Sequence, residues 1–195
     1  MPVLLPTQPP AKQSFRLVSS KNVLEPAFGG GELELRRKGS RYEFAYDYGE
    51  MDYLESLAWS DLHVEGDTLV APVFQPGLDV GEPGAAPVVN GSGQIGAALR
   101  IRALRPGYWF RKGQFLSVVN GGVQRFLYRV FQATQVLPDG TITLPLYTLL
   151  RRPHPDGSVV EIKEPKIEGY PRDVSDTEVY DNHNVEVSFK IRERE

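Results

Sequence analysis

The chain has 195 residues, of which 41% are hydrophobic and 24% charged, and its formal net charge is -3. These values are near the averages of soluble globular proteins, so they exclude wholesale disorder and a fibrous repeat. The length fits one substantial domain better than two large ones. The mild negative charge gives no electrostatic reason to expect nucleic-acid binding. Since the sequence has no cysteine, it excludes disulfides, thiolate metal sites and cysteine nucleophiles.

Residues 1–12 are predicted to form an extended N-terminal arm. Residues 1–10 contain four prolines and show no periodicity, which argues against regular strand pairing. The segment also lacks the basic start and apolar stretch of a secretory signal, and no run in the chain is apolar enough for a membrane-spanning helix. We therefore expect synthesis and folding in a cytoplasm, with the arm lying across a neighbouring copy in an assembly.

Two elements are predicted next. Residues 32–48 alternate between polar and apolar and are interrupted at 38–40, which predicts a β-hairpin with its tip at that interruption. The basic run 36–38 would lie near this tip, where charge usually serves solubility. Residues 50–62 carry apolar side chains at spacings of three and four, which predicts a helix of about three turns. The apolar face of this helix would comprise Met51, Leu54, Leu57, Ala58 and Leu62.

The rest of the chain is predicted to be β-structure. A short apolar strand at 69–74 precedes a Gly- and Pro-rich excursion at 75–87, which is the most natural break between two subregions. From Val88 onward, short strand-like runs alternate with turn signals, as is typical of an antiparallel sandwich or barrel. The predicted strands are 97–103, 114–119, 124–133, 141–146 and 185–191, with a further hairpin turning at 155–157. The predicted fold class is therefore mainly β, an antiparallel β-sandwich or barrel-like domain with one short α-helix.

A glycine-rich motif invites a nucleotide-binding interpretation. Gly91, Gly93 and Gly96 match the G-x-G-x-x-G fingerprint, which works only where the glycines open a helix that holds a pyrophosphate. Residues 99–104 instead alternate like a strand, and Pro106-Gly107 follows them. The pattern favours a glycine-rich turn leading into a strand, so we expect no cofactor.

Candidate metal ligands are sparse. The histidines are far apart and lack the spacing of a zinc pair, which favours surface or structural roles for His63, His154 and His183. Spaced carboxylates can bind calcium, but the one late acidic cluster lacks the EF-hand glycine and terminal glutamate. That cluster, which we interpret as a solvated loop, comprises Asp173, Asp176, Glu178 and Asp181.

No catalytic constellation stands out. There is no G-x-S-x-G elbow for a serine nucleophile, and nothing marks a glycosidase pair among the 25 acidic residues. We therefore expect no enzymatic activity, no catalytic residue and no metal. The aromatic run Tyr108-Trp109-Phe110 can stack on carbohydrate, yet aromatic residues beside a turn more often pack under it or contact a partner chain.

The order of these motifs resembles the distal tail protein family of long-tailed (siphovirus-like) bacteriophages, prophages and gene transfer agents. The first half contributes an R-x-x-x-R-Y-like hairpin at 37–42, one helix, and a strand with P-x-x-Q at 72–75. The second half has a V-x-G-x-G-Q-x-G turn at 89–96, and order and spacing carry more weight than any single motif. The further matching segments are 99–104, 107–115, 126–130, 139–141, 145–152 and 185–191.

The resemblance implies one tail-hub-type β domain over residues 1–195 that closes into a ring of six copies. Such a ring would connect the tail tube to the tail tip or baseplate in the virion tail, after assembly in the bacterial host cytoplasm. The implied partners are further copies, the tail tube protein and tail tip or baseplate hub proteins, with no membrane and no sequence-specific nucleic acid. The alternative is a carbohydrate-binding or adhesin-like β-sandwich that stacks sugars on Tyr108, Trp109 and Tyr147.

Overall fold

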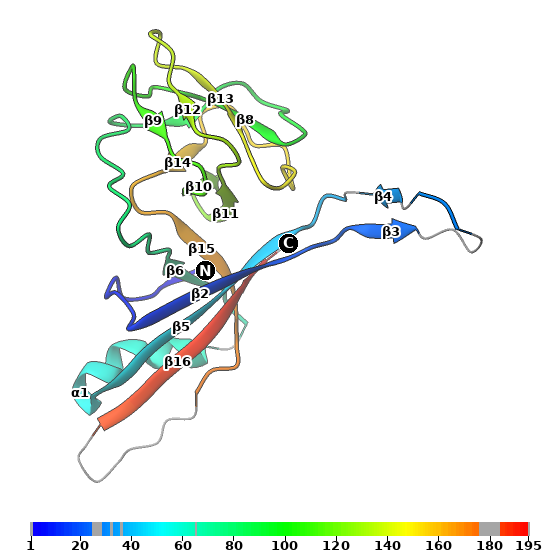
Figure 1. Ribbon diagram of the computed structural model, residues 1–195. Coiled ribbons are helices and arrows are strands. Elements are labelled where there is room, and N and C mark those ends of the chain that lie inside the picture. Colours follow the sequence, from blue (N-terminus) through cyan, green and yellow to red (C-terminus); the bar gives the residue numbers. More distant parts are fainter. Residues whose placement is uncertain are drawn as a thin grey trace.

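The computed structural model describes residues 2–24, 29–31, 33–35, 37–64, 66–175 and 184–194. These residues are mainly β, with several antiparallel sheets and one short α-helix, which confirms the predicted fold class. Figure 1 shows a long twisted sheet, a second β-body beside it, and a thin hairpin that projects from one end of the long sheet.

The first sheet joins both ends of the described chain in the order β1-β6-β15-β16-β5-β2. Only the β1–β6 pair is parallel, and the other neighbours in this sheet are antiparallel. The buried alternation predicted at the end of the chain is confirmed, because Val185, Val187, Phe189 and Ile191 of β16 are all buried. The strands are β1 (Val3–Leu4), β2 (Lys12–Val18), β5 (Arg41–Asp52), β6 (Leu69–Pro72), β15 (Lys166–Arg172) and β16 (Asn184–Glu193).

The second sheet has the order β11-β10-β14-β7-β8-β13 and closes into a small barrel. Beyond the paired strands, Val130 forms a β-bridge with Leu146, so the two outer strands meet. The N–H of Phe131 donates to the carbonyl of Pro145 at 2.9 Å, which adds to this closure. The strands are β7 (Val88–Val89), β8 (Ala98–Arg102), β10 (Phe115–Asn120), β11 (Gln124–Arg129), β13 (Ile142–Pro145) and β14 (Val159–Glu161).

The barrel is an insertion between β6 and β15 of the first sheet. The predicted excursion at 75–87 is the outgoing connection, and 162–165 is the short return. Gln75 fastens the outgoing segment, since its side-chain amide accepts from the N–H of Phe115 at 2.7 Å and donates to the carbonyl of the same residue at 3.4 Å. A short pair, β9 (Trp109–Phe110) with β12 (Thr134–Gln135), lies beside the barrel.

Two buried carboxylates from the first sheet bind the outer edge of β11. Glu168 of β15 accepts a hydrogen bond from the backbone N–H of Arg125 at 2.7 Å. Glu193 of β16 accepts one from the N–H of Leu127 at 2.6 Å. The two glutamates are 0% and 1% exposed, so these charge-assisted bonds lie in the interior, between the sheet and the barrel.

Each of these carboxylates also has an arginine partner. Arg194 lies 3.1 Å from Glu168, and Arg151 forms an ion pair with Glu193. Burial raises the pKa of the Glu193 carboxyl, whereas Arg151 and the backbone N–H of Leu127 oppose that rise. Both charges are therefore compensated where they are buried, as a stable buried ion pair requires.

The predicted N-terminal arm, residues 1–12, is partly paired within its own chain. The N–H groups of Val3 and Leu5 donate to the carbonyls of Thr68 and Val70 at 2.8 and 2.9 Å. Leu5 is buried in the core of the first sheet. The expectation of no ladder bonds is wrong here, because the prolines leave the N–H groups of alternate residues free to donate.

The hairpin predicted over residues 32–48 is wrong in its pairing. β4 (Leu33–Leu35) pairs with β3 (Asn22–Leu24), whereas β5 pairs with β2 and β16. Residues 38–40 lie at a step between these two pairings and are not the tip. The chain reverses between β3 and β4, where Gly29-Gly30-Gly31 is the turn signal that the pattern analysis passed over.

The predicted helix over 50–62 is shorter than expected. β5 continues through Asp52, α1 covers Tyr53–Ser56, and a 3₁₀-helix, η1, covers Leu57–His63. The Asp52 carboxylate accepts a hydrogen bond from the N–H of Leu54 at 2.8 Å, which fixes the helix start at Tyr53.

The turn predicted at 155–157 is present, but it does not form a hairpin. β14 pairs with β10 and β7, and no strand is formed around Leu149. The Asp156 carboxylate accepts from the N–H of Gly91 at 2.7 Å and from Arg102 at 2.6 Å. These bonds hold the turn against the β7–β8 connection instead.

Gly169 of β15 is a position where a side chain cannot fit. It faces Glu193 in register, and a Cβ atom at Gly169 would overlap the carbonyl oxygen of Arg192. Because backbone cannot rotate away, Gly169→Ala should lower the free energy of unfolding by about 1–3 kcal/mol in chemical denaturation. Gly31→Ala is the control, since a Cβ there meets no atom within 4 Å, and it should change stability by less than about 0.5 kcal/mol. Equal stabilities of the two variants would contradict this packing.

Candidate interaction surfaces

The first candidate surface is the projecting hairpin of β3 and β4. It is called the arm from here on and is distinct from the N-terminal segment 1–12. Figure 1 shows it extending away from both the sheet and the barrel. At its foot, the Ser20 hydroxyl donates to the carbonyl of Arg37 at 3.0 Å, and the Ser20 N–H donates to the Ser40 hydroxyl at 3.2 Å. The arm therefore continues the β2–β5 pair across a step, with its two strands tied together at the foot.

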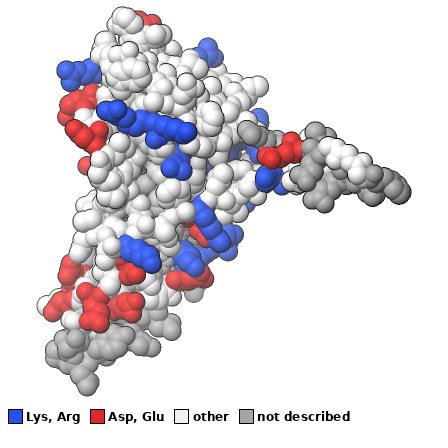
Figure 2. All heavy atoms as spheres, in the orientation of Figure 1, with Lys and Arg blue, Asp and Glu red and all other residues white. Residues whose placement is uncertain are grey.

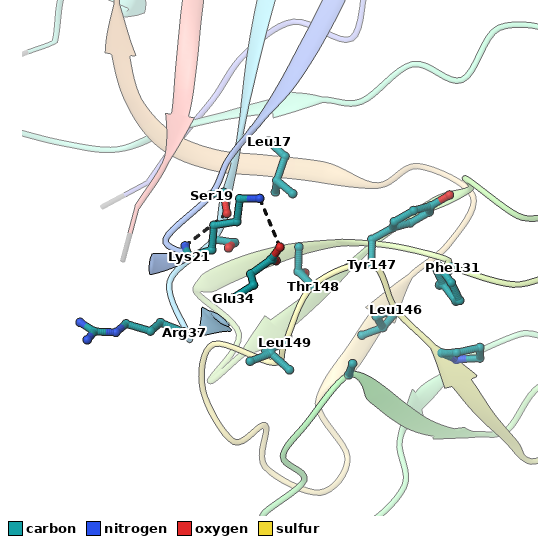
Figure 3. Close-up of a pocket in the computed structure, with 13 residues that line it drawn as sticks. Leu17, Ser19, Lys21, Glu34, Arg37, Phe131, Leu146, Tyr147, Thr148 and Leu149 are labelled. Atoms are coloured by element: carbon teal, nitrogen blue, oxygen red, sulfur yellow. Dashed lines mark hydrogen bonds and ion pairs between the residues drawn. The ribbon is translucent and has the colours of Figure 1, made fainter. Parts of the chain in front are cut away.

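The second candidate surface is a groove of about 550 Å³ between the foot of the arm and the barrel. In Figure 3, Leu17 and the rings of Phe131 and Tyr147 line one part, and these three side chains are 39–50% exposed. The other part is charged, with Lys21 lying 3.4 Å from Glu34. The groove thus offers aromatic edges and a polar rim to an extended segment or a small ligand.

Arg129 contacts the aromatic side chains at this part of the groove. Its guanidinium lies 4.9 Å from the ring centre of Phe15 and 5.3 Å from those of Phe115 and Tyr147. Its Nε donates to the carbonyl of Gly113 at 2.9 Å. These cation–π contacts link β2 of the sheet to the barrel and hold the Tyr147 ring in place.

The third candidate surface is the helical end, defined as residues 53–63 with the adjoining ends of β5 and β16. The predicted apolar face is partly wrong here, because Leu54 is 75% exposed and Leu57 is 49% exposed. Leu62 is buried as predicted, and Trp59 is buried with it, since residues three apart share a face in a 3₁₀-helix. The helical end therefore presents apolar side chains that the other described residues leave exposed.

The glycine motif at 91–96 leads into the strand β8, so the predicted turn into a strand is confirmed. The Gln94 side chain fills this turn. Its amide nitrogen donates to the carbonyls of Asn90 and Gly91 at 3.0 and 2.9 Å, and its amide oxygen accepts from the N–H of Arg100 at 2.6 Å. The space inside the turn is occupied by the Gln94 side chain, and the described residues that follow it form a strand and not a helix.

The two described histidines lie in different parts of the molecule. His63 is exposed at the end of η1, His154 is buried in the barrel, and His183 is outside the described residues. His154 Nδ1 lies 2.8 Å from the Asn120 side-chain oxygen, and Nε2 lies 2.8 Å from the Tyr128 hydroxyl. An amide oxygen only accepts, so a neutral ring donates from Nδ1 and accepts from Tyr128 at Nε2. This role is structural.

Of the acidic cluster, only Asp173 lies among the described residues, whereas the aromatic run is described in full. Asp173 pairs with Lys190 at 2.7 Å, and the other members, Asp176, Glu178 and Asp181, are outside the described residues. Within the described ranges, no group of three potential metal ligands is found. Trp109 is half-exposed, but it does not line the groove that contains Tyr147. Tyr108 packs against the barrel core and Phe110 is buried.

No protein-family model matches the sequence, and a search of curated proteins found no match. Among the described residues, no helix has the length and apolar composition needed to cross a membrane.

The neutral state of His154 makes stability depend on pH. Burial, with a smaller contribution from the charge on Arg151, lowers the pKa of His154 from 6.5 to about 4. The unfolded chain takes up this proton first, so stability is complete above pH 6.5 and falls as the pH drops toward 4. Between pH 7 and 5 the loss should be about 2 kcal/mol. Denaturant titrations should show that His154→Gln removes this slope, whereas the exposed control His63→Gln keeps it. An unchanged slope in His154→Gln would contradict the assignment.

Proposed function

We propose that this protein is a structural component of a phage tail, a distal tail or tail-hub subunit. It forms a ring of about six copies that connects the tail tube to the tail tip or baseplate. The observation that carries the proposal is the arm, because a two-stranded hairpin that projects into solvent is marginally stable alone and gains support from a neighbour.

The surface of the arm fits this role. Val23 and Leu24 of β3 and Leu35 of β4 are 39–53% exposed, although strands of a monomer usually turn such side chains toward a core. The order of turns and strands along the chain adds support through its resemblance to the distal tail protein family. A mainly β chain with one short helix is also what that resemblance implies.

The mass of the purified protein in solution tests the proposal. Light scattering over a concentration series should give a species of about six chains, and negative-stain images should show closed rings with a central opening. A chain that stays monomeric at every concentration, both alone and with the tail tube protein, would overturn the ring. Open filaments would overturn it too, because a head-to-tail contact that fails to close cannot cap a tube.

A second candidate function is carbohydrate binding, favoured by the exposed rings of Tyr147 and Phe131 beside the groove. In that case a monomer should bind on a glycan array, and Tyr147→Ala should abolish binding while the protein stays folded. Trp109→Ala is the matched comparison, since Trp109 is 50% exposed, against 39% for Tyr147, but lies outside the groove. Loss of binding only in Trp109→Ala would move the sugar site to β9.

A further inference from the structure

The foot of the arm carries basic side chains, and its strands expose apolar side chains beside Glu34. Arg37 and Lys38 are exposed after β4, and Lys21, which pairs with Glu34, precedes β3. Figure 2 shows basic side chains at the foot of the arm and along the adjoining end of the long sheet, with acidic side chains among them. The arm therefore combines open apolar positions with positive charge, which is the composition of a surface that docks on an acidic, apolar partner.

The helical end has the complementary composition. Tyr53, Leu54 and Leu57 are 43–75% exposed there, and the sequence contains no Lys or Arg between Arg41 and Arg100. Figure 2 shows acidic side chains gathered at this end of the molecule. The exposed carboxylates around the apolar patch belong to Glu50, Asp52, Glu55, Asp61 and Glu186.

One strand separates these two surfaces. β5 begins at Arg41, directly after the foot of the arm, and ends at Asp52, directly before α1. A strand of 12 residues spans about 35–40 Å, so the arm cannot reach the helical end of its own chain. Two complementary surfaces at opposite ends of a rigid strand can meet only between molecules.

We infer that the arm of one copy docks on the helical end of the next copy, head to tail. This inference rests on the proposed ring and names the two surfaces that form its subunit contact. Leu24 and Leu35 of the arm cover the exposed leucines of α1 and η1, while Arg37 and Lys38 at the foot face the carboxylates of β5 and α1. The charges set the orientation and speed of docking, and the buried apolar area holds the contact.

A charge exchange between the two surfaces tests this contact. The arm variant is Arg37→Glu with Lys38→Glu, and the helix variant is Glu55→Lys with Asp61→Lys. In either variant alone, like charges face each other, so the dissociation constant should rise at least about tenfold. Mixed in equal amounts, the two variants should assemble again, because each arm then finds a helical end of opposite charge.

The control is Lys112→Glu with Glu164→Lys, two exposed positions on neither surface, which should assemble like the unchanged protein. Circular dichroism confirms that each variant is folded. If the unchanged protein assembles and both variants assemble equally well, the arm-to-helix contact is wrong while the ring stands. If charge exchange controls assembly but the product is an open filament, the contact stands and the ring is wrong. An unchanged protein that never self-associates overturns both.

Discussion

The arrangement of the sheet and the barrel depends on Glu168 and Glu193. Their carboxylates accept hydrogen bonds from backbone N–H groups of β11, as the carbonyls of a neighbouring strand would. The outer edge of β11 has N–H groups that would otherwise be buried without acceptors, at a cost of about 1–3 kcal/mol each. Glu168 and Glu193 accept from two of them, and their own charges are offset by arginines. Removing one partner of such a buried pair costs about 3–5 kcal/mol, so the angle between sheet and barrel is strongly fixed. That angle sets the groove, since one wall of it comes from each body.

Strand edges explain where the molecule remains available to partners. The barrel has little open edge, because its outer strands meet at Val130 and Leu146 and the rest of β11 is bound by carboxylates. In the first sheet, β2 is an outer strand, and it leads directly into the arm. Open edges pair readily with other chains, so a protein that keeps one beside an apolar arm is suited to ordered association. The barrel, with little open edge, thus contributes stability, whereas the arm and the edge of β2 offer the surface for assembly.

Local patterns predicted the strands whose partners are near in sequence or whose alternation is strong. The β10–β11 hairpin and the buried positions of β16 followed directly from turn residues and period-two alternation. The pairing of β5 with β16 could not be predicted, because alternation shows which face is buried and not which strand lies alongside. The roles of Glu168 and Glu193 were also hidden, since a carboxylate in a strand ordinarily indicates a solvated face. The β3–β4 hairpin was not predicted, because the alternation over 32–48 placed a hairpin tip at 38–40 and gave the glycines at 29–31 no role.

The insertion of the barrel between β6 and β15 has a consequence for synthesis. Barrel strands pair mainly within residues 88–161, so the barrel can fold as soon as that segment leaves the ribosome. The first sheet must wait longer, because β16 pairs with β5 on one side and β15 on the other and is made after the whole barrel. Until then, the aromatic face of β5, with Tyr42, Phe44 and Tyr46, lacks its central partner. A nascent chain in which the barrel is complete therefore still exposes the apolar face of β5, and this interval is when the chain is most open to aggregation.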